Sequence, residues 1–311
     1  MRFGATLRPS QGLLAPLTES LSRRIAEERA GEVLARDPDL VRRLAPSVAR
    51  CVGYFSPEVR GVEHLPVTGP VLLVGNHCCL FYMPDAWVVG LAITARRGAD
   101  SPAYVLAYDL LFGLPVVGSA LRRLGAVPAG GEEAERLLTE GAAVLDYPGG
   151  DAEACRPWSE RNRIVFSGHT GFVRLALRTG VPVVPVVTYG SHDAIVVLTR
   201  GDRLASALGL PRLRVKVFPI LLGPFGITSI LTPPLPMPAA ITVEFMPPFD
   251  WSALGPGAAD DEAVVDACYQ DITSAMQSTL DRLHSEQPHP VLRGWSHLLR
   301  QGPAPLRVGT E

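Results

Sequence analysis

The sequence has no apolar run long enough to cross a membrane, and it has almost no lysine. A membrane span needs roughly 18 to 20 consecutive apolar residues, and the nearest candidate, Ile220–Met237, is interrupted by four prolines. Met1–Leu14 lacks the continuous apolar core of a secretory signal. Lys216 is the only lysine and the net charge is -2, so the composition gives no general case for binding nucleic acid. We therefore expect no nucleic-acid partner, and contact with a membrane only at its surface.

The five cysteines are scattered and show neither a Cys-x-x-Cys pair nor the spacing of a zinc site. This pattern predicts reduced thiols in a cytoplasmic protein and no metal site. The Gly-x-Ser-x-Gly motif of many ester hydrolases is also absent, which argues against a lipid esterase.

Strand-like and helix-like segments alternate from about residue 70 to residue 190. This alternation is typical of an α/β protein with a mostly parallel sheet flanked by helices. We expect a helical extension over residues 1–58, one α/β domain over residues 59–285, and a loose tail over residues 286–311.

Prolines lead to two further expectations. Pro182 and Pro185 fall within the strand expected at Val181–Thr188, and because proline cannot donate to a sheet we expect that strand to be partly unpaired or distorted. The apolar, proline-rich segment 219–238 is not expected to form a regular element. Exposed apolar loops of this kind mark ligand grooves or membrane contacts, and the alternative is a buried loop that wraps around the domain.

The apolar run Val71–Gly75 predicts a short buried strand, and polar residues follow it at once. His77 comes two positions after the strand, and Asp85 follows Pro84, which suits the first turn of a helix. Side chains at the carboxyl end of an α/β sheet commonly form its site. A histidine whose second nitrogen is held by a carboxylate can take a proton from a hydroxyl. We therefore interpret His77 as a general base oriented by Asp85, with a pKa near the usual value of about 6.5.

Several motifs taken together resemble the glycerolipid (PlsC-like) acyltransferase family. They are Gly75-Asn76-His77 with Asp85, Tyr147-Pro148-Gly149-Gly150, the segment Gly171–Gly180, and Val181–Pro185. They follow the family's order over roughly residues 60 to 250. The Pro-Gly-Gly and Gly-Phe-Val-Arg-Leu-Ala runs look most similar to the branch that includes monoacylglycerol and diacylglycerol acyltransferases.

The resemblance implies a PlsC-like acyltransferase fold and acyl transfer without a cofactor. The donor would be the thioester of acyl-CoA or of an acyl carrier protein, and the acceptor a hydroxyl of a glycerolipid or another lipid alcohol. Asn76, Gly149 and Gly150 are then candidates for the region that binds the acyl donor and its oxyanion, because glycines allow a close approach of backbone N–H groups.

The sequence departs from the lysophosphatidate branch of the family. Seven residues separate His77 from Asp85 where that branch has four, and the arginine expected six positions after Gly125 is replaced by Gly131. The third block, Phe-Pro-Glu-Gly-Thr-Arg in that branch, is here Tyr-Pro-Gly-Gly-Asp-Ala over residues 147–152. The charged residues that would hold an acceptor phosphate are therefore missing, and a neutral acceptor of the monoacylglycerol or diacylglycerol type is the simpler inference.

Alternatives stay open at this point. Arg123, Glu153 and Arg156 lie near these motifs in the sequence and are candidates for contacts with an acceptor or its phosphate, as in a lysophosphatidate acyltransferase. Cys78 and Cys79 could form a covalent acyl-cysteine with His77 as its base, although small packing residues are the simpler interpretation. The chain could also be a degenerate member that only binds lipid or membranes. The localisation we expect is cytoplasmic, peripheral on the inner face of the membrane.

Overall fold

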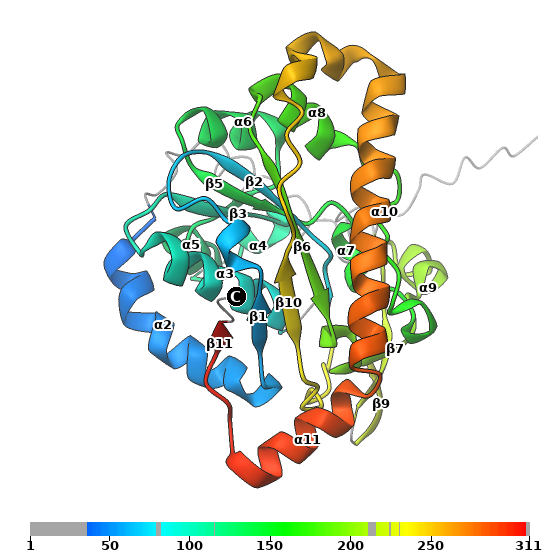
Figure 1. Ribbon diagram of the computed structural model, residues 1–311. Coiled ribbons are helices and arrows are strands. Elements are labelled where there is room, and N and C mark those ends of the chain that lie inside the picture. Colours follow the sequence, from blue (N-terminus) through cyan, green and yellow to red (C-terminus); the bar gives the residue numbers. More distant parts are fainter. Residues whose placement is uncertain are drawn as a thin grey trace, which may run out of the picture.

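A computed structural model describes residues 36–78, 82–114, 116–210, 216–223, 225–229 and 231–308 (Figure 1). Within these ranges an eight-stranded sheet has the order β11-β1-β10-β6-β2-β5-β3-β4. Its strands are β1 (Glu58–Arg60), β2 (Val71–Gly75), β3 (Ala103–Ala107), β4 (Ala126–Pro128), β5 (Ala143–Asp146), β6 (Val183–Tyr189), β10 (Thr242–Phe245) and β11 (Arg307–Val308). All neighbouring pairs are parallel except β10 and β6. The expected mostly parallel sheet is confirmed.

Helices pack on both faces of this sheet. One core contains residues of α6 (Gly131–Thr139), α8 (Gly171–Thr179) and α10 (Glu262–Glu286), and the other contains residues of α2 (Pro38–Val52) and α3 (Pro84–Arg97). The remaining α-helices are α4 (Asp109–Phe112), α5 (Val117–Arg123), α7 (Gly150–Ala154), α9 (Asp202–Ala207) and α11 (Pro290–Gln301). The predicted α/β class with an N-terminal helix is therefore present, while residues 1–35 lie outside the described residues.

Strand β2 lies between β6 and β5 and is buried on both faces. Leu72 and Val74 point into the core with α6, α8 and α10, whereas Val71 and Leu73 point into the core with α2 and α3. A strand covered on both faces is a continuous apolar run rather than an alternating one, which is why these residues predict it well. Its carboxyl end at Gly75 delivers the polar residues that follow.

Strand β6 differs from the expectation drawn from its prolines. It is paired along both edges, with β2 in parallel and β10 in antiparallel orientation. Pro185 lies opposite Val74, and its carbonyl accepts the N–H of Met246 at 2.9 Å. Proline lacks a donor but keeps its acceptor, so this strand occupies the middle of the sheet in spite of its prolines.

Two segments expected to be irregular or loose contain regular structure. Residues 286–311 were predicted to form a loose tail, but they include α11 and β11, which pairs in parallel with β1. Residues 219–238 include β8 (Ile220–Gly223) and β9 (Gly226–Ser229), which form an antiparallel sheet with β7 (Val196–Thr199). β11 pairs with a strand distant in sequence, whereas β8 and β9 form a local hairpin that β7 extends.

Candidate active site

The carboxyl ends of β2 and β6 are tied together by one amide. The Asn76 side chain donates to the carbonyl of Thr188 at 2.9 Å and accepts the N–H of Thr188 at 2.7 Å. Asn76 is buried, and its side-chain amide supplies hydrogen-bond partners for both backbone groups of Thr188 after the pairing of β2 with β6 has ended. Its side chain holds the turn that carries His77, which differs from the contact with the acyl donor or oxyanion suggested by the resemblance.

His77 and Asp85 form the predicted pair. The Nδ1 of His77 lies 2.7 Å from Oδ2 of Asp85, which also accepts the N–H of Cys78 at 3.2 Å. Asp85 is fully buried in the first turn of α3, and the His77 side chain retains 13% exposure. A carboxylate can only accept, so it fixes the tautomer with the proton on Nδ1 and leaves Nε2 as the basic nitrogen. The seven intervening residues therefore still allow the two side chains to meet.

The charge of Asp85 changes the basicity of His77. Burial is the largest effect and lowers the pKa of His77, but the negative charge and hydrogen bond of Asp85 together with the negative charge of Glu153 outweigh it, and the net pKa is raised. The pKa expected from the sequence, close to the usual histidine value, is therefore corrected upward. A raised pKa makes the imidazole a stronger base.

Tyr147 forms one wall of the site and was not identified as a site residue from the sequence. Its ring stacks on the His77 ring with centroids 4.6 Å apart and an interplanar angle of 28°. A Cβ at Gly75 would lie 2.6 Å from the Tyr147 ring, so only glycine fits there. The Tyr147 hydroxyl is buried and has no hydrogen-bond partner among the described residues. Tyr147 directly follows β5, the neighbour of β2, and that position could have indicated its proximity.

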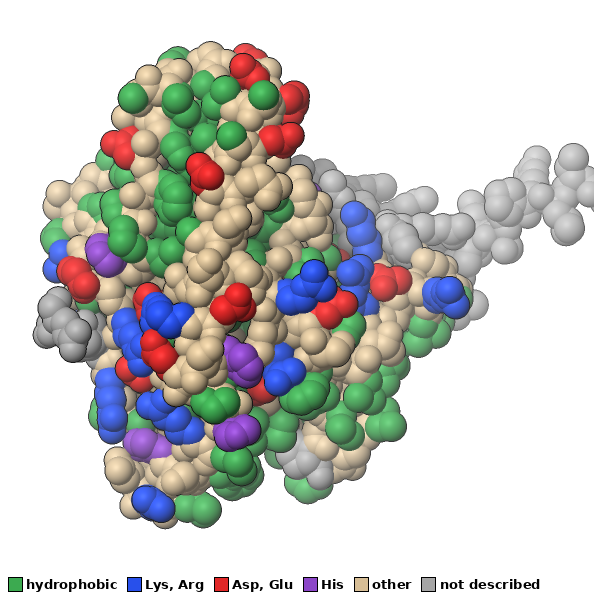
Figure 2. Space-filling model, turned by 45° about the vertical axis from the view of Figure 1, so that its right-hand side comes forward, with side chains coloured by type: hydrophobic (Ala, Val, Ile, Leu, Met, Phe, Trp, Pro, Cys, Tyr) green, Lys and Arg blue, Asp and Glu red, His purple; other side chains and the backbone are tan. Residues whose placement is uncertain are grey.

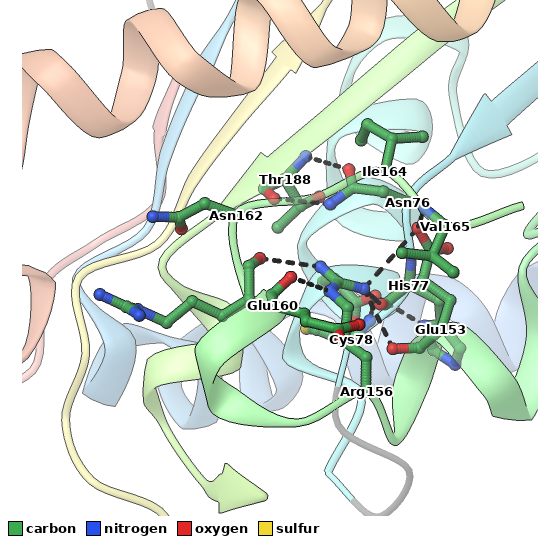
Figure 3. Close-up of polar contacts among 12 residues, drawn as sticks. Asn76, His77, Cys78, Glu153, Arg156, Glu160, Asn162, Ile164, Val165 and Thr188 are labelled. Carbon is green, nitrogen blue, oxygen red and sulfur yellow. Dashed lines mark hydrogen bonds and ion pairs between the residues drawn. The ribbon is translucent and has the colours of Figure 1, made fainter.

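A buried acid and a buried arginine hold the backbone of His77 (Figure 3). Glu153 accepts the N–H of His77 at 2.8 Å and, through its other oxygen, the N–H of Val165 at 3.0 Å. Arg156 donates to the carbonyl of His77 at 3.0 Å, and its guanidinium lies 3.6 Å from the Glu153 carboxylate. Both backbone groups of the histidine are thus fixed by one ion pair from α7 and the turn after it.

This arrangement changes the role predicted for Glu153 and Arg156. Arg156 also donates to the carbonyls of Glu153, Glu160 and Arg161, so its guanidinium is used inside the protein instead of contacting an acceptor. Burial raises the pKa of Glu153 to about 7, against the opposing effect of the positive charge of Arg156. The pair therefore holds the backbone of His77.

Arg123 is placed at a different part of the fold. It lies at the end of α5 and donates to Asp37 at 2.7 Å, where Asp37 also caps α2 through the N–H of Leu40. The structure therefore assigns Arg123 to the contact between α5 and α2 and does not bring it to His77 as an acceptor contact.

The two candidate oxyanion glycines differ in their surroundings. A Cβ at Gly149 would lie 2.4 Å from the Glu153 side chain, so the absence of a side chain allows the turn to close over Glu153. Gly150 has a φ of 52°, and its N–H donates to the carbonyl of Tyr147 at 3.0 Å. The Gly150 N–H is thus part of the turn, which leaves Gly149 as the candidate of the two to donate to an oxyanion.

His192 is a second buried histidine that sequence reasoning missed. It follows β6 just as His77 follows the adjacent parallel strand β2, so the rule applied to His77 could have found it. Neither of its ring nitrogens makes a hydrogen bond within the part of the chain that the structure describes. Burial, then the positive charges of Arg156 and His77, lower its pKa well below the usual value. These surroundings therefore disfavour the protonated form of His192.

Cys78 packs in a small apolar cluster with Ile195, Val197 and Leu221. A buried thiol in such surroundings is typical of a packing residue rather than a nucleophile, while Cys79 lies outside the described residues. Across the described ranges, no group of three His, Cys, Asp or Glu side chains is arranged to hold a metal ion. No helix in these ranges is long and apolar enough to span a bilayer.

Several known proteins are similar in sequence to this chain. A protein of Mycobacterium tuberculosis (strain ATCC 25618 / H37Rv), named only as uncharacterized, is 29% identical over 273 residues, which cover 87% of this chain and 74% of that protein. The DGAT1/2-independent enzyme synthesizing storage lipids of Bos taurus is 25% identical over 74% of this chain and 65% of its own. Phytyl ester synthase 1, chloroplastic, of Arabidopsis thaliana is 30% identical over 46% of this chain and 21% of its own.

The solved structure of the 1-acyl-sn-glycerophosphate (LPA) acyltransferase PlsC from Thermotoga maritima is also similar, with a TM-score of 0.44 and 16% identity over 88% of this chain and 97% of that one. Residues 56–189 match the family described as Acyltransferase. This region begins just before β1 and ends with β6, so it includes His77, Asp85, Tyr147, Glu153 and Arg156. Residues 56–189 of this chain are therefore a region of the Acyltransferase family.

Proposed function

We propose that this protein transfers a fatty acyl group from a thioester, of acyl-CoA or of an acyl carrier protein, to the hydroxyl of a neutral lipid alcohol. The observation that carries the proposal is the 2.7 Å contact between His77 and the fully buried Asp85. A carboxylate held in this way places the proton of the neutral imidazole on Nδ1, so that the lone pair of Nε2 can accept a proton from a hydroxyl. This geometry favours an active enzyme over a degenerate lipid-binding protein.

The reaction needs one base and no cofactor. Nε2 of His77 takes the proton from the acceptor hydroxyl while its oxygen forms a bond to the thioester carbonyl carbon. The tetrahedral intermediate then collapses, the carbon–sulfur bond breaks, and the imidazolium returns its proton to the leaving thiolate. Asp85 stabilises the imidazolium that exists between these two steps. The products are an ester and a free thiol.

The assignment of a neutral acceptor depends on where the arginines point. Arg156 is buried and donates to backbone carbonyls, and Arg123 pairs with Asp37, so neither is available to a phosphate. The names of two relatives support the same inference, since one synthesises storage lipids and the other is a phytyl ester synthase. Monoacylglycerol, diacylglycerol and a long-chain alcohol are therefore the acceptors to test first, with lysophosphatidate as the phosphorylated comparison.

The test is a thiol-release assay with acyl-CoA or acyl carrier protein as donor and the four acceptors above. We expect thiol release with a neutral acceptor, and a loss of about 10²- to 10⁴-fold in kcat for His77→Ala. His64→Ala is a matched control, because His64 is also partly buried and its ring contacts a backbone carbonyl, that of Phe245, at 2.9 Å. A folded His77→Ala protein with full activity would refute the mechanism. Release only with lysophosphatidate would refute the neutral acceptor.

A further inference from the structure

Exposed apolar side chains gather on two neighbouring elements at one end of the molecule. On α11, Leu292, Trp295 and Leu299 are exposed, with Leu299 at 79%. They lie three and four positions apart and therefore share one face of the helix. On and beside the β8–β9 hairpin, Phe225, Ile227 and Leu231 are exposed, with Phe225 at 88%. These six residues are called the apolar base below.

The two parts of the apolar base adjoin the same stretch of chain. The carbonyl of Pro290, the first residue of α11, accepts the N–H of Ala240 at 2.9 Å, and Gly294 packs directly on the carbonyl of Pro238. Residues 236–240 connect the small sheet to β10. In Figure 1, α11 lies at the bottom of the molecule and β7 and β9 lie beside it at the lower right.

The apolar base lies at the same end of the fold as the site. Figure 1 shows β6 pointing toward this end, and β2, which delivers His77, is parallel to β6. Cys78, the residue after His77, packs against Val197 of β7 and Leu221 of β8. Tyr82, in the turn before Asp85, donates to the carbonyl of Pro234 at 3.1 Å. The small sheet thus packs directly against the turn that carries the catalytic pair.

The chain segments that carry the apolar base contain basic residues and no acids. Residues 203–243 and 287–310 contain no Asp or Glu, although acids make up 31 of the 311 residues. Exposed basic residues in these segments are Arg203 and Lys216 near the hairpin, Arg293 and Arg300 on α11, and Arg307 on β11. An acid from outside these segments, Glu58 of β1, lies 3.6 Å from Arg293 and also pairs with Arg60. Figure 2 shows hydrophobic side chains toward the bottom and lower right, with the acidic side chains of that view higher up.

We infer that the apolar base docks on the surface of an anionic lipid bilayer. Exposed leucine, tryptophan and phenylalanine beside arginine and lysine, in segments that contain no acids, match the apolar interior and the negative headgroups of such a surface. A protein partner would require no such exclusion of acids. The inference rests on the proposed function in one respect: docking would place the mouth of the site where a lipid alcohol lies in the membrane.

Vesicle binding of the full chain tests this inference without any substrate. The probe is sedimentation with vesicles of phosphatidylcholine, with or without phosphatidylglycerol. Burial of one large apolar side chain is worth at least about tenfold in binding, so we expect Leu292→Ser with Leu299→Ser, and separately Phe225→Ser with Ile227→Ser, each to weaken binding by at least tenfold. We expect Lys216→Glu and Arg300→Glu each to weaken binding to the anionic vesicles by about fivefold or more.

The matched control is Val67→Ser with Leu254→Ser. Both residues are exposed, but Val67 precedes β2 and Leu254 follows the antiparallel strand β10, so they lie at the opposite end of the sheet. Control binding equal to wild type supports the inference. Three results would overturn it. The control could lose binding as much as the variants of the apolar base, neither pair of apolar-base variants could lose binding, or these variants could only abolish a dimer seen in gel filtration.

Activity separates this inference from the proposed function. With a short-chain acceptor dissolved as monomers, the variants of the apolar base should release thiol at the wild-type rate. With a long-chain acceptor in vesicles, their rate of thiol release should fall in proportion to their loss of vesicle binding. If the variants of the apolar base lose vesicle binding but the wild-type protein shows no acyl transfer, the docking surface is supported and the proposed enzymatic function is refuted. If the variants of the apolar base no longer bind vesicles but transfer acyl groups to the vesicle-bound acceptor at the wild-type rate, the docking surface is refuted and the proposed enzymatic function is supported.

Discussion

Glu153 accepts the backbone N–H of His77 at 2.8 Å, so a residue 76 positions away in sequence fixes the backbone of the proposed base. The same carboxylate holds the N–H of Val165. Because both donors are buried or partly buried, each needs an acceptor to offset the loss of water. The orientation of His77 therefore depends on Glu153 as well as on Asp85.

Glu153→Gln should weaken both stability and catalysis. Glutamine has one acceptor oxygen where glutamate has two, so either His77 or Val165 loses its acceptor. We expect a loss of about 1 to 3 kcal/mol in the free energy of unfolding and a lower kcat with little change in KM. Urea denaturation and steady-state kinetics measure these changes. Glu140→Gln, which removes an exposed ion pair with Arg136, serves as the control, and an equally small effect of both changes would contradict the positioning role.

Stability should fall as the pH rises toward and above 7. Burial raises the pKa of Glu153 to about 7, and the pKa of His77 is also raised. Groups with raised folded-state pKa values bind protons more tightly in the folded protein, so their contribution is complete at low pH and is lost as the pH passes the folded values. For Glu153 the change is roughly 3 kcal/mol. Urea denaturation at a series of pH values measures it, and a flatter curve for Glu153→Gln is expected.

Tyr147 should act through its ring and not through its hydroxyl. The ring stacks on His77, whereas the hydroxyl is buried and makes no hydrogen bond with the described residues. Tyr147→Phe should therefore keep kcat within about threefold and leave the melting temperature equal or higher, since an unsatisfied buried polar group is costly. Tyr147→Ala should lower both. A Tyr147→Phe protein with a kcat reduced a hundredfold would instead show that the hydroxyl contacts the reacting atoms.

Asn76 should be more important for the fold than its neighbour Thr188. Asn76→Asp replaces the amide donor to the Thr188 carbonyl with an acceptor and buries a charge, so a loss of about 2 to 4 kcal/mol in the free energy of unfolding is expected. Thr188→Val keeps both backbone bonds and removes a hydroxyl that has no partner among the described residues. It should be neutral in the same denaturation experiment. Similar losses for the two variants would argue against the tie between β2 and β6.

Local patterns predicted the parts of the site that are close in sequence. The run Val71–Gly75 is apolar throughout because β2 is covered on both faces, and Pro84 starts α3 so that Asp85 reaches back to His77. These features depend on neighbours within a few residues, and the alternation of strands and helices likewise predicted the sheet.

Long-range pairings were beyond local patterns. The role of Glu153 depends on β5 lying beside β2, and the loose tail expected after residue 286 contains β11 because β1 offers it an edge. The central position of β6 similarly depends on β10, which reaches it from the other side. Proline content and local polarity carry no information about such partners, so sequence alone left Arg156 as a candidate contact for an acceptor and did not connect it to the His77 carbonyl.

The pH dependence of kcat/KM for thiol release, in the wild type and in Asp85→Asn, tests the central claim most directly. A free base must be unprotonated, so activity should rise with pH through an apparent pKa above the usual histidine value of about 6.5. Asp85→Asn removes the negative charge that raises this pKa, so the apparent value should fall and kcat should drop by about 10²- to 10⁴-fold. Identical pH profiles and rates for the two proteins would contradict the assignment of His77 and Asp85 as base and orienting acid.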